Sequence, residues 1–251
     1  MSAPRTVFDG LGCLLQGFRV IATQPKLFVL GMVPPLVMSV LLVAGYVWLL
    51  LNVGQLAGSI LTALPWAAAG GVWQVLLAIL LAVGALLLIV LTFSTLTLTL
   101  GSPIYDVVSA GVDRTAGPVP PDAADPVARM IPRAIWQALV TIFLSAVGAV
   151  VCFLIGLVPA LGSVVGVLAS WTFGGWMMAR ELIGPTCDRR GMFRLADRRR
   201  MLGRHLPATL GFGIPAFWLL SLPLVSVVVF PAAVAGATLL ARGMLENQPS
   251  R

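Results

Sequence analysis

Charge is scarce in this 251-residue chain. Only 10% of its residues are Asp, Glu, Lys or Arg, whereas an ordinary soluble domain has about 25%. The 16 basic and 9 acidic side chains cannot cover the surface of a soluble protein in which 59% of the residues are hydrophobic. The composition therefore excludes an ordinary soluble domain and predicts an integral membrane protein.

Cysteine and histidine are also rare. The three cysteines, Cys13, Cys152 and Cys187, are an odd number, widely spaced and without a CxxC pair. A disulfide framework or a metal site is not expected, since both need clustered ligands. His205, the single histidine, borders an apolar run, and we interpret it as an interfacial side chain because no acid or nucleophile has a defined spacing to it. We expect no metal, no cofactor and no enzymatic activity.

Three long runs carry no charge: 27–105, 134–179 and 205–241. A transmembrane helix needs about 20 apolar residues, so the first run predicts two full transmembrane helices, 27–53 and 72–100, joined by an uncharged loop rich in Gly and Ala. The residues before this run carry four charges, and the run is too long for the apolar part of a cleaved signal peptide. We therefore interpret it as part of the membrane domain.

Prolines modify these two helices. Pro34 and Pro35 should bend or break the first one near its start, because proline lacks a donor and clashes with the preceding turn. Ser102 is a good N-cap and Pro103 a good first helical residue, so we expect a separate amphipathic helix at 103–115 that lies along the membrane interface. Four hydroxyl residues fall near one face of the second helix: Thr92, Thr95, Thr99 and Ser102. This face is either a polar contact between helices or the lining of a pathway.

The other two runs are each broken by a proline. The run 134–179 is interrupted around Pro159 and Gly162, and the run 205–241 at Pro223. The resulting arms of about 20 and about 17 residues barely reach across roughly 30 Å of hydrocarbon. We therefore predict an all-α membrane protein in which two partly inserted hairpins follow the two full spans, with turns that pack or shape a path. Small residues recur every four positions after the first break, and they let another helix approach closely: Gly162, Gly166, Ser170 and Gly174.

Positive charge is confined to one set of segments. All 16 Lys and Arg residues lie before residue 27, in 106–133, in 180–204 or after 241. The positive-inside rule makes these segments cytoplasmic, both termini included, and the chain forms a single membrane domain, 1–251. The cytoplasmic segment 180–204 contains an arginine cluster at 189–204, which we expect to contact anionic lipids. Nucleic-acid binding is not expected, because no aromatic platform accompanies these arginines.

Four stretches, taken in order, carry a resemblance to a known family: QGFRVIATQPKLFVLGMVPPLV, SPIYDVVSAGVD, LVPALGSVVG and FPAAVAGATLLARG. They resemble the CysZ sulfate permeases and the related etoposide-induced membrane protein family, over the chain from about Gly10 to Arg242. The resemblance implies a multi-pass protein of the bacterial inner membrane with two full spans and two partly inserted hairpins. It also implies a homo-oligomer through which sulfate enters the cytoplasm.

The anion site is where this chain departs from that family. In CysZ proteins the first helix opens with proline, glycine, an aliphatic residue and arginine, and the resemblance implies that sulfate is held at this turn. The corresponding stretch here is Pro25–Val29, in which Lys26 is the only cation. Backbone amides at a helix N-terminus still favour an anion, but lysine is a point charge and cannot replace the guanidinium fork. We therefore assign anion binding to Lys26, with Arg19 in partial compensation.

Two classes of function fit these observations. The first is a permease or channel that passes sulfate or a similar small oxyanion. The second is a membrane scaffold or interaction protein of the same family that transports nothing. The missing arginine turn favours the second class, and so does the lack of charge inside the apolar runs, since intramembrane ionisable groups mark coupled pathways.

Overall fold

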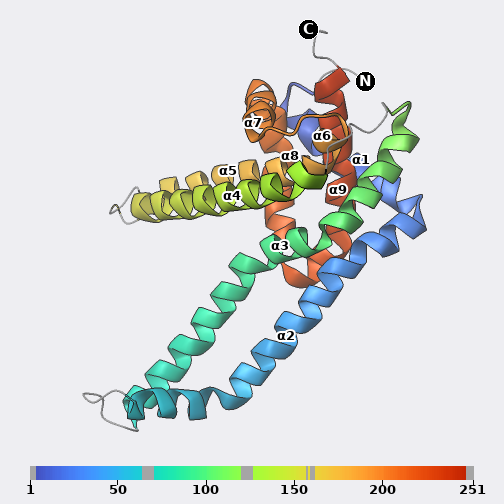
Figure 1. Cartoon of the computed structure of the whole chain (residues 1–251). Coiled ribbons are helices and arrows are strands. Elements are labelled where there is room, and N and C mark those ends of the chain that lie inside the picture. Colours follow the sequence, from blue (N-terminus) through green and yellow to red (C-terminus); the bar gives the residue numbers. More distant parts are fainter. Residues whose placement is uncertain (1–3, 64–70, 120–126, 157, 159–161, 247–251) are drawn as a thin grey trace.

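The computed structural model describes residues 4–63, 71–119, 127–156, 158 and 162–246, and over this part of the chain it is helical with short turns. The helices are α1 (Val7–Ala22), α2 (Pro25–Thr62), α3 (Val72–Ala116), α4 (Val127–Gly156), α5 (Gly162–Leu182), α6 (Gly184–Arg189), α7 (Leu195–Arg204), α8 (Leu206–Ser221) and α9 (Pro223–Glu246). The all-α prediction is confirmed. Figure 1 shows a group of packed helices near both termini, from which two pairs project, α2 with α3 and α4 with α5.

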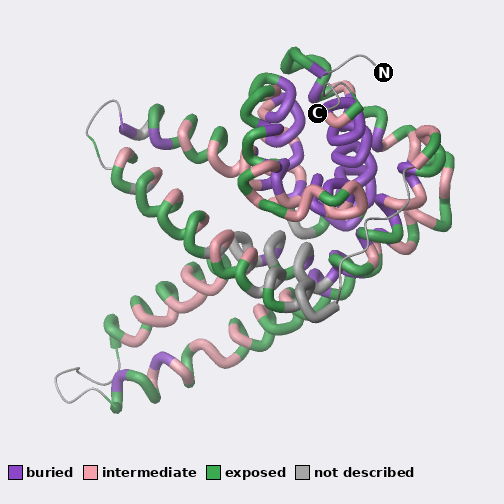
Figure 2. Tube along the Cα trace, turned by 45° about the horizontal axis from the view of Figure 1, so that its top comes forward, coloured by how far each residue is buried: buried purple, intermediate pink, exposed green. Residues whose placement is uncertain are grey.

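Helix α9 is the centre of this group. Every residue from Val229 to Met244 is buried, and α1, α2, α3 and α8 all pack against it. A helix that is buried on every face needs neighbours on every side, and glycines bring them close. A Cβ atom at Gly17 of α1 would lie 2.3 Å from the carbonyl oxygen of Ala232. Figure 2 shows the buried residues concentrated in this part of the molecule.

Helices α8 and α9 occupy the predicted second hairpin and meet at Leu222, with Pro223 as the first residue of α9. The arms are unequal, because α9 has 24 residues and continues to Glu246. At 1.5 Å per residue it is about 36 Å long, enough to cross the hydrocarbon core. The expected end at Ala241 was wrong because Arg242 is buried against other helices and does not mark the end of the helix.

Helix α2 continues through both prolines that we expected to bend or break it. Pro34 and Pro35 are buried within a continuous helix, and the prediction of a break is wrong. A Cβ atom at Gly101 of α3 would lie 2.8 Å from Cβ of Pro34, so the two helices touch at this point. Packing against a neighbour is what lets a membrane helix tolerate the missing donor. The helix also includes residues 54–62, which we expected to form a loop.

Helix α3 likewise continues through Pro103, so the separate helix expected at 103–115 is absent. The residues after Pro103 are held in line by packing against α9. The ring of Tyr105 stacks on that of Phe230 with their centroids 5.5 Å apart, and Val108 and Val112 are fully buried. Tertiary packing therefore overrides the local start signal at Ser102. The side chains of the other three residues on the predicted hydroxyl face lie outside the described part of the structure: Thr92, Thr95 and Thr99.

Helices α4 and α5 form a pair in the region of the predicted first hairpin, 134–179, and run side by side (Figure 1). Pro159 lies outside the described residues. Close to it, a Cβ atom at Gly162 would lie 2.4 Å from the carbonyl oxygen of Ile155, and one at Gly166 would lie 2.8 Å from Cα of Gly156. The small residues at the start of α5 thus pack directly on the end of α4.

Three described stretches are long and apolar enough to cross a membrane: Pro25–Thr62, Leu139–Gly156 and Leu224–Glu246. Their surroundings differ. The apolar stretch of α4 has no buried residue among those described, whereas most of the α9 stretch is buried inside the molecule. Figure 2 shows the projecting pairs as mainly exposed or half-buried. Apolar side chains this exposed fit a lipid environment, and the protein is a multi-span membrane protein.

Candidate functional site

A hollow of about 450 Å³ opens beside the C-terminal end of α1. Its lining comes from α1, the turn into α2, the end of α3, and α9: Gln16, Arg19, Val20, Thr23, Gln24, Thr115, Ala116 and Leu239. We call it the Arg19 hollow, because Arg19 is the charged residue in this lining. The hydroxyl of Thr115 donates to the carbonyl oxygen of Val112 and accepts from the amide of Gln24 at 3.3 Å. The hydroxyls of Thr115 and Thr23 donate to backbone carbonyls, so Arg19 and the side-chain amides are the groups in this lining that can donate to a small anion.

Lys26 is in the first turn of α2, exposed, and outside the lining of the Arg19 hollow. The N-cap of this helix is Gln24, which lines the hollow. Its side chain makes no hydrogen bond to the helix and donates to Thr115 instead. Arg19 and Lys26 therefore lie near the same turn, but the hollow contains only the arginine. Two of the predicted hairpin positions are described. Gly162 lies where α5 packs on the end of α4, and Pro223 is the first residue of α9.

A second group of charges, which the sequence reasoning missed, lies at the end of α3. Asp113 is completely buried and contacts three arginines, Arg189 and Arg190 from the α6 region and Arg242 from α9. Arg190 holds both carboxylate oxygens, at 2.7 and 2.8 Å. Arg189 and Arg242 approach to only 3.4 and 3.3 Å. We call these four residues the Asp113 cluster.

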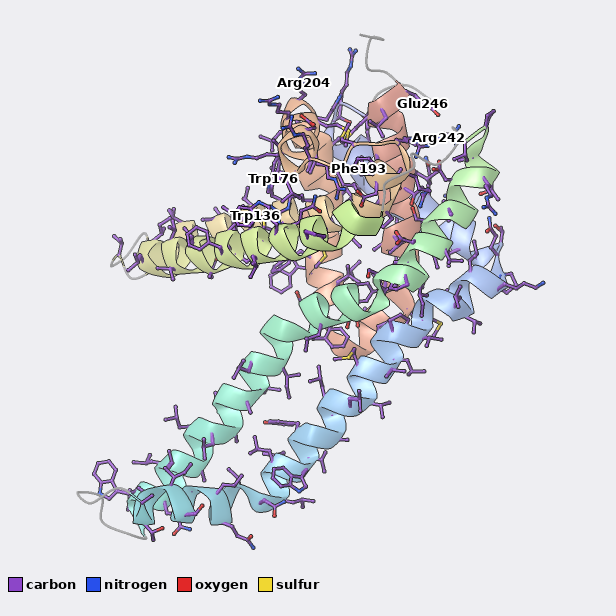
Figure 3. All side chains as sticks on the ribbon, in the orientation of Figure 1. Trp136, Trp176, Phe193, Arg204, Arg242 and Glu246 are labelled. Atoms are coloured by element: carbon purple, nitrogen blue, oxygen red, sulfur yellow. The ribbon has the colours of Figure 1, made fainter. Side chains whose placement is uncertain are left out.

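Arg242 makes further contacts that fix the end of α9 on α3. Its guanidinium donates to the backbone carbonyls of Asp113, at 2.9 Å, and of Pro118, at 3.3 Å. It also pairs with Glu246 one turn along α9 (Figure 3). A Cβ atom at Gly117 would lie 2.6 Å from Nη2 of Arg242, and the φ of +140° at this glycine is one that other residues rarely adopt. The chain therefore turns tightly around the arginine.

Buried hydroxyls lie beside the Asp113 cluster. Thr238 donates to the carbonyl oxygen of Val234 at 2.8 Å, so it accepts from Ser109 at 2.7 Å. Ser109 in turn accepts from Arg189 at 2.7 Å and lies 3.0 Å from the hydroxyl of Thr186. The direction of each hydrogen bond follows from these partners, and the network joins α3, α6 and α9 in the interior.

The spacing of these residues was a usable signal. Ser109 and Asp113 are four residues apart on α3, and Thr238 and Arg242 are four apart on α9. Each pair therefore occupies one face of its helix. Both pairs lie in stretches quoted above for the family resemblance. The sequence alone could not show that the two faces meet, because 129 residues separate the partners.

The environment of Asp113 lowers its pKa below the usual range for a carboxyl. Burial raises this pKa, but the hydrogen bonds and charge of Arg190, with the charges of Arg189 and Arg242, outweigh the effect of burial. Asp106, two turns earlier on α3, behaves in the opposite way. Burial raises its pKa, the Arg189 charge lowers it, and the Asp188 charge raises it further. Asp113 is thus the ionised partner of the arginines.

The arginine cluster expected to face lipid divides into two sets. Arg189 and Arg190 point to Asp113, and Arg198 is buried and pairs with Asp188. The other four are exposed: Arg194, Arg199, Arg200 and Arg204. Figure 3 shows Arg204 at the edge of the molecule. The idea of a single lipid-facing cluster is corrected because the acids of α3 and α6 draw three of the arginines inward.

The described residues form a multi-span helical membrane protein in which charged groups pack around the ends of α3 and α9. Residues 13–231 match the family described as "Sulfate transporter CysZ/Etoposide-induced protein 2.4". Since this match covers most of the chain, the protein belongs to that family, and the resemblance in the sequence is confirmed.

Individual relatives agree with the family match. A protein of Vibrio cholerae serotype O1 named "Sulfate transporter CysZ" is 26% identical over 241 residues, which cover 92% of this chain and 91% of the relative. One of Vibrio parahaemolyticus with the same name is 28% identical over 247 residues, 91% of this chain and 92% of the relative. One of Pseudomonas fluorescens, also so named, is 30% identical over 167 residues, 64% of this chain and 66% of the relative. Relatives of this family are named as transporters.

Proposed function

We propose that this protein is a permease or channel that passes sulfate, or a similar small oxyanion, across the bacterial inner membrane. Family membership and relatives named as sulfate transporters support transport at the family level. The observation that supports anion binding is the Arg19 hollow, in which a guanidinium lies with the side-chain amides of Gln16 and Gln24. Arg19 finds no carboxylate within ion-pair distance among the described residues, so its charge is available to an anion.

In this proposal Arg19 binds the anion and Lys26 attracts it. Guanidinium groups bind oxyanions through two parallel hydrogen bonds, whereas an exposed ammonium acts through its charge alone. Lys26 is exposed and follows Gln24 of the hollow's lining by two residues. Its charge raises the local anion concentration. The hairpin turns near Pro159 and Pro223 then shape the path between the helices. Loss of Arg19 should therefore weaken binding more than loss of Lys26 does.

The proposed setting is a homo-oligomer in the inner membrane with both termini in the cytoplasm. The exposed set of arginines supports this orientation, because Arg194, Arg199, Arg200 and Arg204 are free to contact anionic headgroups. Each such arginine adds about 1 kcal/mol of attraction near the surface. The hollow, Lys26 and these arginines would then all lie at the cytoplasmic mouth.

The proposal is tested by uptake of radiolabelled sulfate into liposomes that contain the purified protein. We expect uptake that saturates, that unlabelled sulfate or sulfite reduces, and that chloride does not. Arg19→Gln should lower the uptake about tenfold or more, since it removes a charge-assisted bidentate contact. Lys26→Gln should have a smaller effect, and Arg200→Gln, an exposed arginine outside the hollow, serves as the matched control.

The alternative function is that of a membrane scaffold. The stretch Pro25–Val29, with lysine where CysZ proteins have the glycine-arginine turn, favours it. Uptake no faster than into empty liposomes, in a sample shown to be inserted and folded, would overturn the permease proposal. The same protein should then be found with a stable partner after cross-linking in its own membrane.

A further inference from the structure

The Asp113 cluster contains more positive charge than its buried acid can balance. Arg189, Arg190 and Arg242 are 12%, 12% and 7% exposed, and they surround one fully buried carboxylate. Three other acids lie near these arginines, and each is at least partly exposed: Asp106, Asp188, which pairs with Arg198, and Glu246. Glu246 pairs with Arg242, and Arg189 donates to the backbone carbonyl of Asp106 at 3.4 Å and also acts on the Asp106 carboxyl through its charge. Buried charges are normally matched by partners, so the interior of this cluster favours an additional anion.

Hydrogen-bond donors are also in surplus. A guanidinium has five N–H donors, whereas a carboxylate has two oxygens with about four acceptor sites. Arg190 uses both oxygens of Asp113, which leaves Arg189 with one long contact to the carboxylate. The Nε of Arg189 is buried and has no hydrogen-bond partner among the described residues. A buried donor without a partner is costly, and an ion with more oxygens than a carboxylate would satisfy it.

The Asp113 cluster and the Arg19 hollow both involve the last turns of α3 and the C-terminal half of α9. Thr115 and Ala116, which line the hollow, follow Asp113 by two and three residues on α3. Leu239, also in the lining, comes three residues before Arg242 on α9. One helical turn on each helix therefore separates the hollow from the arginines.

We propose that Arg189, Arg190 and Arg242 form a binding site for a small inorganic tetrahedral oxyanion such as sulfate, and that the Asp113 carboxylate closes this site as a tethered competing anion. The site has the chemistry that oxyanions need, namely three guanidinium groups that meet at one carboxylate. In the structure the carboxylate occupies the position of the ion. An arriving oxyanion must displace it from Arg190, so Asp113 limits entry.

This inference rests on the proposed function for its physiological ligand, but its test needs no transport. Binding of radiolabelled sulfate is measured by equilibrium dialysis on the full-length protein in detergent without added lipid. Asp113→Asn removes the competing charge with little change in shape, and we expect it to raise the affinity for sulfate at least about tenfold. Asp197→Asn, the same substitution on α7 at an acid whose contact is the exposed Arg200 at 3.8 Å, should leave the affinity unchanged. Asp113→Asn combined with Arg189→Gln should lose most of the gain.

Asp113→Asn leaves three buried arginines without their carboxylate and can therefore fail to fold. The double variant Asp113→Asn, Arg190→Gln removes one charge of each sign, which is better tolerated than loss of one partner alone. It leaves Arg189 and Arg242 facing a neutral side chain at position 113, and we expect it to bind sulfate more tightly than the natural protein. Equal or weaker binding by the folded variants, with Arg189 making no difference, would overturn the proposal.

Thermal unfolding separates the possible sources of the oxyanion. We expect sulfate to raise the unfolding temperature of the Asp113→Asn protein more than chloride of equal ionic strength does. Stabilisation by short-chain phosphatidylglycerol but not by sulfate would identify a lipid headgroup as the ligand and overturn the assignment to an inorganic ion. If the natural protein fails to carry sulfate into liposomes, the proposed function is lost, while sulfate binding by the variants stands or falls on its own measurement.

Discussion

Arg190 holds both carboxylate oxygens of Asp113 although 77 residues separate the two in the sequence, with Nη1 2.7 Å from Oδ2 and Nη2 2.8 Å from Oδ1. This pair connects the end of α3 to the turn that follows α6. Because Arg242 of α9 contacts the same carboxylate, one acid fastens three separate parts of the chain. The pair therefore has a structural role whether or not an anion ever replaces the carboxylate.

Replacing Arg190 by lysine should destabilise the protein even though the charge is kept. Lysine can satisfy only one of the two oxygens and lacks the planar fork. We expect a loss of about 1–3 kcal/mol in the free energy of unfolding, the range for a hydrogen bond to a charged group, seen as a lower unfolding temperature in detergent. Arg200→Lys, at an exposed arginine whose contact to Asp197 is 3.8 Å, should change nothing measurable. Equal unfolding temperatures for the two variants would contradict the role of the fork.

Stability should fall in acid because of Asp113. Its pKa is lowered in the folded protein, so the carboxylate stabilises the fold above its unfolded pKa of about 3.9. That contribution is lost as the pH falls through the lower, folded pKa. We expect a flat unfolding temperature between about pH 5 and 8 and a decline below about pH 4.

The capping carboxylate of Asp9 adds to this acid decline, because the backbone N–H groups of Thr6 and Arg5 also lower its pKa. Asp113→Asn should remove the Asp113 part of the decline, and Asp9→Asn only the part due to the cap. Asp106 affects the free energy of unfolding in the opposite direction. Its pKa is raised by burial, so Asp106→Asn should leave stability at pH 7 unchanged or higher. An acid decline that is identical in all three variants would refute this assignment.

The third prediction concerns two glycines of α1, one of which packs closely against another helix. A Cβ atom at Gly10 would lie 2.0 Å from the carbonyl oxygen of Ala208 in α8, whereas one at Gly12 meets nothing within 4 Å. Gly10→Ala should force α1 and α8 apart and cost about 1–3 kcal/mol. Gly12→Ala should be neutral or stabilise by up to about 1 kcal/mol, because alanine favours the helix. Unfolding temperatures of the two variants provide the comparison, and a stable Gly10→Ala protein would mean that the crossing is looser than described.

Helix content and the existence of apolar spans were predictable from the sequence, since they depend on charge-free runs that need no partner. The boundaries near Pro34, Ser102 and Ala241 were not. At each of these positions a local signal was correct in isolation and was overridden by packing against another helix. Pro34 rests against Gly101, Tyr105 stacks on Phe230, and Arg242 reaches Asp113. Contacts between segments this far apart cannot be read from either segment alone.

The candidate site also has one part that the sequence could predict and one part that it could not. A cation beside an expected helix start is a local pattern, and Arg19 lines a hollow, while anion binding by Arg19 and Lys26 stays a prediction. The Asp113 cluster was missed because its charges looked like solvent-facing or lipid-facing residues at the ends of apolar runs. Only the fold shows that Arg189 and Arg190 turn inward while Arg199 and Arg200 remain exposed.

The orientation in the membrane gives the last prediction, which uses cysteine labelling. The buried Cys187 and Cys13 should not react in the folded protein, because burial raises the pKa of their thiols to about 12 and about 11. Only Cys152, which is partly exposed, needs replacement by alanine. In that background we introduce Arg200→Cys on α7 and, as the opposite probe, Ser59→Cys near the end of α2; both positions are exposed.

With the basic segments in the cytoplasm, a membrane-impermeant maleimide should label the Ser59→Cys protein in intact spheroplasts and the Arg200→Cys protein only in inverted vesicles. Labelling of both positions from the outside in comparable amounts would mean that the chain inserts in two orientations. The reverse pattern would place both termini outside. Only the reverse pattern would remove the Arg19 hollow from the cytoplasmic mouth in every molecule, because α7 and the C-terminal end of α1 lie with the packed helices from which α2 and α3 project (Figure 1).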